Sequence, residues 1–285
     1  SRNNIAKSLE DADMVFITAG MGGGTGTGAA PTVADIARES GVLTVAVVTK
    51  PFSFEGRRRM EQAKRGINEL LGKVDSLLII PNDRLKYATD QKVTFANAFE
   101  IADDVLRQAV VSISDLIKNT GFINLDFADV TAVMKNAGYA HMGVGRAAGK
   151  GKAEEAARAA VASPLLETSI DGAKGVLINI TGSEEMGLDD VEAAASLVQA
   201  AADPEANIIF GATFDNAMED EIRVTVIATG FDSAPGEEAP QAKPEEKPEE
   251  QLFTAAAAKA EAEQPAKPAE DEDPLDSIFK IFNSK

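Results

Sequence analysis

The residues best suited to chemistry form a glycine-rich run from Gly20 to Gly28. The run follows the apolar segment Met14–Ile17 and precedes the helix-compatible segment Ala29–Ser40, which predicts a turn from a strand into a helix. Because residues 22–28 have no side chain larger than threonine, such a turn can bring its backbone N–H groups against an anion. We therefore predict a phosphate-binding loop. Its predicted contacts are Gly22, Gly23, Gly24, Thr25 and Gly26.

Two other interpretations of this loop are open. It could be a connection that is rich in glycine only for flexibility, although a short turn does not need so many glycines. It could also bind a dinucleotide, since Gly24–Ala29 fits the loose pattern G-x-G-x-x-A. A dinucleotide fold, however, has an acidic residue at the end of the next strand, and here the strand Val42–Val48 ends in Thr49-Lys50-Pro51. An NAD-dependent enzyme is therefore the weaker interpretation, and the absence of a following Gly-Lys-Ser or Gly-Lys-Thr disfavours a Walker loop.

Two further motifs follow in the chain, Phe-Ser-Phe-Glu-Gly-Arg-Arg-Arg at 52–59 and Asn-Leu-Asp-Phe-Ala-Asp at 124–129. Together with the glycine run, they resemble the FtsZ branch of the tubulin/FtsZ family of GTPases. The resemblance extends from Ser1 to about Phe231. That family's domain opens with a strand and another glycine-rich phosphate loop, which have no counterpart before Gly20. The resemblance thus implies an N-terminally truncated GTP-binding domain, and we expect residues 1–285 by themselves to bind GTP weakly and to be inactive.

The resemblance also implies roles for single residues. Phe99 and Asp103 match the aromatic residue and the acid that recognise guanine, and an aspartate can accept from the N1 and N2 donors of the base. Contacts to the ribose and phosphates are implied for Glu55, Arg59 and, less securely, Asn82. The catalytic residues would be Asn124, Asp126 and Asp129, in a loop that completes the nucleotide site of the next subunit.

Each of these residues also has an ordinary structural interpretation. By its spacing alone, Phe99 is a core residue. Asp103 and Arg107 could form a surface pair four residues apart on a helix. Arg57–Arg59 could be a solvated charge run, and Asp126 or Asp129 could cap a short helix starting at Phe127.

The alternation of strands and helices predicts an α/β fold with a parallel sheet in the nucleotide-binding part. A long central helix and a second, smaller α/β domain follow, and the last two strands are expected to form an antiparallel pair. The expected strands are 15–18, 43–48, 77–80, one near Met142, 176–180, 208–212 and 222–228, and the expected helices are 29–40, 95–117, 153–166 and 189–202. The corresponding domains are 1–94 (the remainder of the GTP-binding domain), 95–118 (the central helix), 119–231 (the catalytic loop and the C-terminal domain), 232–270 (a linker) and 271–285 (a peptide).

The central helix has apolar residues at a spacing of three and four along its whole length. The residues that we expect to be buried are Phe95, Phe99, Ala102, Leu106, Ala109, Val110, Ile113 and Ile117. At 1.5 Å per residue, this helix would hold Asp126 on the order of 30 Å from a ligand of Asp103. An acid at that distance could not act on that ligand within one molecule.

The composition narrows the class of partner. The 28 basic and 46 acidic residues give a net charge of −18, which argues against nucleic acid. Cysteine is absent, so a reducing cytoplasmic location is the simplest expectation. No apolar run is long enough to span a bilayer.

The C-terminal stretch from Asp232 to Lys285 has 14 acidic and 6 basic residues and 7 of the 12 prolines, which predicts a disordered acidic tail. At its end, Leu275, Ile278, Phe279 and Phe282 fall at helical spacing. This peptide resembles the segment with which the family binds membrane tethers and division regulators. A frayed end is the alternative interpretation.

From these observations we expect a GTPase that assembles head to tail into filaments at the bacterial division site. It would bind GTP or GDP, with Mg²⁺ carried by the nucleotide. The main alternative is a nucleotide-binding polymer scaffold with little hydrolysis. The acids at the end of the central helix favour the enzyme, because a scaffold does not need them.

Overall fold

A computed structural model describes residues 2–87, 92–118, 126–166, 170, 172–215 and 217–231. Its helices are α1 (Arg2–Ser8), α2 (Thr25–Glu39), α3 (Arg57–Leu71), α4 (Ala98–Lys118), α5 (Phe127–Met134), α6 (Lys152–Val161) and α7 (Leu188–Ala201), with 3₁₀ turns η1 (Ser53–Glu55) and η2 (Asn82–Tyr87). Its strands are β1 (Met14–Gly20), β2 (Leu43–Lys50), β3 (Ser76–Pro81), β4 (Gly138–Ala148), β5 (Gly175–Gly182), β6 (Asn207–Phe214) and β7 (Glu221–Phe231). In this part of the chain, no helix has the length and apolar character to cross a membrane. The seven expected strands are confirmed, and the six with predicted bounds are two to four residues longer than predicted.

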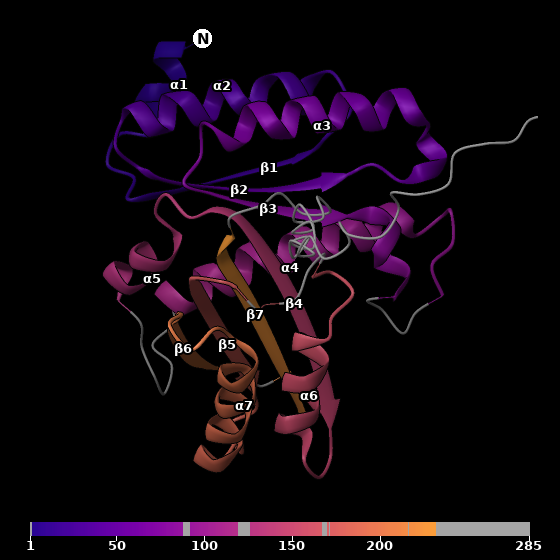
Figure 1. The fold of residues 1–285 in the computed structure, drawn as a ribbon, viewed down its shortest axis with the longest axis vertical. Helices are drawn as coiled ribbons and strands as arrows, with labels where there is room; N and C mark the ends of the chain where they lie inside the picture. The colour runs from indigo at the N-terminus through magenta and orange to yellow at the C-terminus, as the bar shows by residue number, and fades with distance from the viewer. Residues whose placement is uncertain are drawn as a thin grey trace, which may run out of the picture. The chain divides into compact units, whose positions relative to one another are not determined.

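The seven strands form one sheet in the order β1-β2-β3-β4-β7-β5-β6 (Figure 1). The first three strands are parallel, as the sequence predicts. The expected pairing of the last two strands is wrong: β7 lies between β4 and β5 and is antiparallel to both, whereas β6 pairs with β5 in parallel. The reason is that α7 connects β5 to β6 as a crossover, which leaves the other edge of β5 for β7.

A short parallel contact joins β3 to β4 through residues 76–78 and 138–140. The strands of the two expected domains therefore belong to one continuous sheet. The boundary between these domains remains a prediction.

Alternate residues of β2 face opposite layers of helices. Val45 and Val47 pack in the cluster that contains α4 and α5, and Ala46 and Val48 pack in the cluster that contains α2 and α3. All four are fully buried. Burial on both faces explains why this strand is a continuous apolar run.

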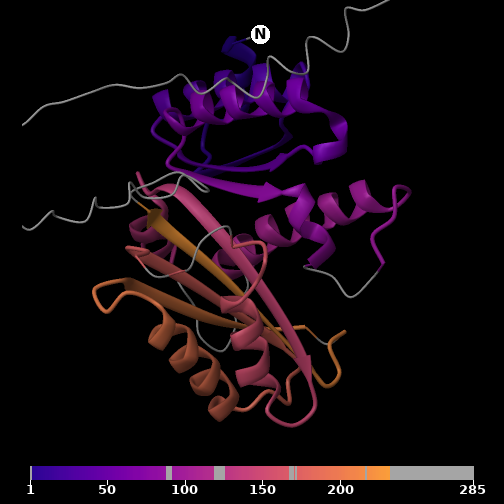
Figure 2. The same cartoon turned by 45° about the vertical axis from the view of Figure 1, so that its right-hand side comes forward.

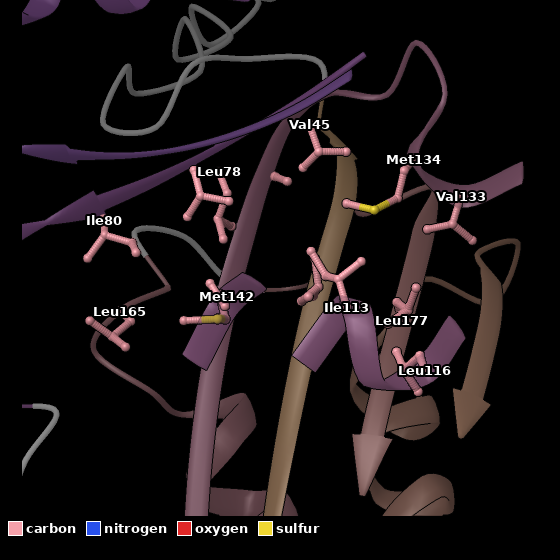
Figure 3. Close-up of a cluster of buried hydrophobic side chains, with 14 of the residues drawn as sticks. Val45, Leu78, Ile80, Ile113, Leu116, Val133, Met134, Met142, Leu165 and Leu177 are labelled. Carbon is pink, nitrogen blue, oxygen red and sulfur yellow. The ribbon is translucent and has the colours of Figure 1, made fainter. Parts of the chain in front are cut away.

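The central helix α4 begins at Ala98 rather than Phe95. It packs against β2 from the N-terminal part of the chain and against β5 and β6 from the C-terminal part. Figure 3 shows Ile113 and Leu116 of this helix among Leu78, Met142 and Leu177, which come from three strands. The expected burial is confirmed for Ala102, Ala109 and Ile113, whereas the aromatic residues at the start are exposed. Ala98, next to Phe99, is buried at the start of the helix, and Leu116 is buried near its other end.

Helices α6 and α7 lie side by side on β4–β7, on the face of those strands opposite to α4 (Figure 2). A Cβ added at Gly145 of β4 would lie 2.0 Å from the carbonyl oxygen of Ala156, and one at Gly143 would lie 2.1 Å from that of Ala160. The α6 backbone therefore rests directly on glycines of β4, with alanines filling the interface. Helix α6 ends at Val161 and not at Leu166 as expected, because Ser163 and Pro164 follow its last turn.

Candidate functional site

The glycine run connects β1 to α2 in a tight turn. The N–H of Met21 donates to the carbonyl of Thr49 at 3.0 Å, and the N–H of Gly22 donates to Oγ1 of Thr27 at 2.9 Å. Helix α2 begins at Thr25, four residues earlier than the sequence indicated, so the second half of the run forms its first turn. The expected strand-to-helix turn is confirmed.

The glycines of this turn have two different roles. Gly22 has φ +98°, and a Cβ there would lie 2.7 Å from the carbonyl oxygen of Arg59. A Cβ at Gly26 would lie 2.8 Å from the carbonyl oxygen of Gly20. By contrast, a Cβ at Gly23 or Gly24 would meet no atom within 4 Å. Gly22 and Gly26 thus permit close packing, whereas Gly23 and Gly24 leave the space over their backbone open among the described residues.

The N-terminus of α2 is suited to an anion. Gly24 is its N-cap, no side chain caps the helix, and its first turn contains no acid. The first N–H groups of the helix and its positive dipole end are therefore available to a negatively charged group. Gly24 and Thr25 are exposed, so such a group can reach them from solvent.

Glu55 and Arg59 lie together beside this loop. Nη1 of Arg59 is 3.0 Å from Oε2 of Glu55, and Oε1 of Glu55 accepts from the N–H of Phe52 at 2.8 Å. The Glu55 side chain is largely buried, while that of Arg59 is half exposed. The two side chains pair although Glu55 precedes the helix and only Arg59 belongs to α3.

Phe99 joins a group of aromatic rings that also contains Phe52, Phe54 and Phe95, of which only Phe52 is buried. Its ring is 5.6 Å from that of Phe52, which stacks on Phe54 at 5.0 Å, and Phe54 is 5.5 Å from Phe95. Phe99 is 46% exposed, Phe54 59% and Phe95 77%. The interpretation of Phe99 as a core residue, and the expected burial of Phe95, are therefore wrong. An accessible aromatic face remains here that a flat base can cover.

Asp103 is exposed on α4 one turn after Phe99. The alternative that it pairs with Arg107 is wrong, because Arg107 bonds Asp104, with an Nη2–Oδ1 distance of 2.6 Å. This contact is the main cause that lowers the pKa of Asp104. Within the described residues, the side chain of Asp103 has no ion pair or hydrogen bond.

Asn82 follows β3 and is only 5% exposed. Its Oδ1 has no hydrogen-bond partner among the described atoms. A buried carbonyl oxygen without a partner is rare and costs free energy, so a hydrogen-bond donor from a ligand or a water would stabilise it.

The predicted catalytic residues are at the other end of α4. Asn124 lies outside the described residues. Oδ1 of Asp126 accepts from the N–H of Asp129 at 3.0 Å, and Oδ2 of Asp129 accepts from the N–H of Asp126 at 3.3 Å. The two acids thus form a capping box at the start of α5, which confirms the capping interpretation. Fifteen residues of helix between Asp103 and Lys118 correspond to about 22 Å, so these acids do not join the nucleotide-site residues within one chain.

Sequence reasoning missed three residues whose side chains hold the glycine loop or the η1 turn. Thr27 receives the Gly22 N–H, Gln62 donates from Nε2 to the carbonyl of Gly23 at 3.1 Å, and Asp83 bonds Ser53. Thr27 belongs to the glycine run and could have been found there. Gln62 and Asp83 are far from their partners in sequence, and no motif indicates them.

Comparison with known proteins decides the family. Residues 1–90 match the GTPase domain of the Tubulin/FtsZ family, and residues 138–232 match the C-terminal domain of the FtsZ family. An empty FtsZ dimer from M. jannaschii is 45% identical, with a TM-score of 0.77, over 80% of this chain and 66% of that one. A mutant FtsZ from M. jannaschii is also 45% identical, with a TM-score of 0.78, over 81% of this chain and 69% of that one. The chain belongs to the FtsZ family.

The chain therefore spans about two thirds of the length of these FtsZ structures. A GDP-bound CetZ1 monomer from Haloferax volcanii, 18% identical with a TM-score of 0.65, shares the fold. FtsZ is a family of GTPases, so its fold implies guanine-nucleotide binding. The predicted family and fold class are confirmed, while the roles of single residues stay predictions.

Proposed function

We propose that this FtsZ chain binds GTP on the glycine loop and hydrolyses it at the contact with the next subunit of a head-to-tail filament at the division site of the cell. The observation that carries the nucleotide site is the open N-terminus of α2 at Gly23 and Gly24, which no side chain of the described residues caps and which lies beside Arg59. A nucleotide supplies there the phosphoanhydride bond that is broken, with Mg²⁺ on its phosphates.

Each part of the site has a role in this proposal. The N–H groups of α2 hold the phosphates, and Arg59 adds positive charge beside them. Glu55 accepts from ribose hydroxyls, Phe99 covers the base, and Asp103 accepts from its N1 and N2 donors. Asn82 offers its free Oδ1 to a donor of the ligand. Asp126 and Asp129, with Asn124, orient and polarise water at the site of the neighbouring subunit.

Two separate exposed apolar groups support self-assembly. One consists of the rings of Phe54, Phe95 and Phe99, and the other consists of Phe210 and Phe214, which lie four residues apart on the same face of β6. A head-to-tail contact joins two different surfaces of the same protein, so two unlike patches are what it requires. The FtsZ dimer is a precedent among the similar structures.

Hydrolysis as a function of protein concentration tests the proposal in the whole protein. If the site is completed by a second subunit, phosphate release per subunit rises with concentration and then levels off. A constant rate per subunit at all concentrations would contradict completion in trans.

A scaffold that binds nucleotide but hydrolyses little is a second candidate. It is favoured by one observation: Asp126 and Asp129 already have a structural role as the capping box of α5. Filaments that form with GTP and release almost no phosphate would support the scaffold.

The C-terminal peptide 271–285 lies outside the described residues, and its role stays a prediction. We propose that Phe279 and Phe282 anchor it to membrane tethers and division regulators. Deletion of 271–285 should leave GTP-driven assembly unchanged and remove recruitment to the membrane. Loss of assembly, or unchanged localisation, would contradict this role.

A further inference from the structure

Asp83 holds the turn that carries Glu55. The backbone N–H of Ser53 donates to Oδ1 of Asp83 at 3.0 Å, and the Ser53 hydroxyl donates to Oδ2 of the same carboxylate. Ser53 is the first residue of η1, and Asp83 is the second residue of η2. These 3₁₀ turns follow β2 and β3, which are parallel neighbours, so the two segments leave the sheet at the same edge.

The turn is also held through Phe52 and Glu55. The ring of Phe52 is buried, and the Glu55 carboxylate bonds the Phe52 N–H and Arg59. After it comes Gly56, with φ +97° and no atom within 4 Å of an added Cβ, so the chain is not held by packing there. Without the Ser53–Asp83 contact, the turn would be held among the described residues by Glu55 and by the stacked rings of Phe52 and Phe54, of which Phe54 is exposed.

We propose that Asp83 is a positioning residue of the nucleotide site: it fixes the η1 turn so that Glu55 and Phe54 keep one orientation before the ligand binds. The effect of Asp83 on nucleotide affinity rests on the proposed function, but its effect on the order of the η1 turn can be measured without nucleotide. A loop that is already ordered loses less conformational freedom on binding, so its ligand binds more tightly. Asp83 itself acts through Ser53 and needs no contact with the ligand.

Hydrogen exchange in the nucleotide-free whole protein tests the structural part. In Asp83→Ala, amides 52–56 should exchange about five-fold faster, which corresponds to the ~1 kcal/mol of a typical hydrogen bond. Amides of 175–182 in β5 should be unchanged. Asp189→Ala, which removes an exposed carboxylate from α7, is the matched control and should change neither segment. Unchanged amide exchange at 52–56 in Asp83→Ala would overturn the proposal, whether or not the proposed function is correct.

Calorimetric titration with GDP tests the consequence. Asp83→Ala should weaken GDP binding about five-fold and Ser53→Ala about three-fold, while Ser53→Thr, which keeps the hydroxyl, should bind like the wild type. In the Asp83→Ala background, Ser53→Ala should have no further effect, because its partner is already gone. Independent, multiplicative effects of the two changes would overturn the proposal. Failure of the wild type to bind GDP would instead contradict the proposed function and leave the exchange result to decide the role of Asp83.

Discussion

Arg107 bonds the carboxylate of Asp104 and not that of Asp103, with an Nη2–Oδ1 distance of 2.6 Å. Asp103, one residue earlier on α4, is exposed and without an ion pair in the described part of the chain. A partnered and an unpartnered carboxylate thus stand side by side on one helix. This arrangement leaves Asp103 free to accept hydrogen bonds from a ligand.

Replacing Asp103 with asparagine should weaken guanine-nucleotide binding in the whole protein by about 1–3 kcal/mol, because the amide offers a donor where the base also has donors. Titration with GDP measures the effect without inducing assembly. Asp104→Asn is the matched control, since it removes a carboxylate from the same turn, and it should leave affinity within two-fold of the wild type. Equal losses in both variants would mean that only the general negative charge matters.

The carboxyl of Asp104 should titrate below its usual range, because hydrogen bonding to Arg107 is the main cause that lowers its pKa. A lowered pKa in the folded state means that the contact stabilises the protein above the unfolded-state pKa, and that this contribution disappears as the pH falls through the folded-state value. Because the pair is about half exposed, its contribution is only a few tenths of a kcal/mol. Carboxyl-detected NMR titration measures the midpoint. In Arg107→Ala the midpoint should rise, and an unchanged midpoint would show that Arg107 is not the cause.

The sequence predicts the strands well, because the apolar residues of a buried strand follow one another along the chain. Both faces of β2 are covered by helices, so its central residues Val45–Val48 had to be continuously apolar. The place of β7 was not predictable in the same way. Its partners, β4 and β5, are set by long-range pairing, and nothing in residues 222–228 distinguishes a strand beside β6 from one inserted between β4 and β5.

The candidate site was predicted in its parts but not in its contacts. The glycine run identified the loop, yet periodicity could not distinguish the exposed ring of Phe99 from a core residue, since both have helical spacing. Arg107 can reach an acid three or four residues before it, so spacing alone could not choose between Asp104 and Asp103. The Ser53–Asp83 bond joins residues 30 positions apart, and no local pattern encodes it.

Asp126→Asn should abolish GTP hydrolysis while leaving GTP binding and the fold intact. Asparagine caps a helix about as well as aspartate, so the change removes the charge without removing the cap of α5. Asp126→Ala, by comparison, should also lower stability by about 1 kcal/mol. Phosphate release and nucleotide binding are measured on Asp126→Asn alone and mixed with wild type. Mixed filaments should hydrolyse less than the wild-type fraction predicts, and simple additivity would contradict catalysis in trans.

Gly145→Ala should destabilise the C-terminal part of the chain by more than about 3 kcal/mol, because the new Cβ would lie 2.0 Å from the carbonyl oxygen of Ala156 and 2.4 Å from the N of Ala160. Backbone atoms of α6 cannot move aside as a flexible side chain could. Denaturant unfolding checks this, with Gly72→Ala as the control. Gly72 has φ −71° and open space around it, so its substitution should change stability by less than about 0.5 kcal/mol.

Two alanine substitutions in the glycine loop should separate its packing role from its binding role. Gly22→Ala places a Cβ 2.7 Å from the Arg59 carbonyl oxygen at a φ of +98°, so it should lower stability by about 2 kcal/mol or more and weaken nucleotide binding as well. Gly24→Ala meets no protein atom within 4 Å, so its free energy of unfolding should stay within about 0.5 kcal/mol of the wild type. If the phosphates lie over this residue, the same methyl group fills the space that they need, and GDP affinity should fall about ten-fold or more. Denaturant unfolding without nucleotide and calorimetric titration with GDP measure the two effects separately. A Gly24→Ala protein that is stable and binds GDP as well as the wild type would place the phosphates elsewhere.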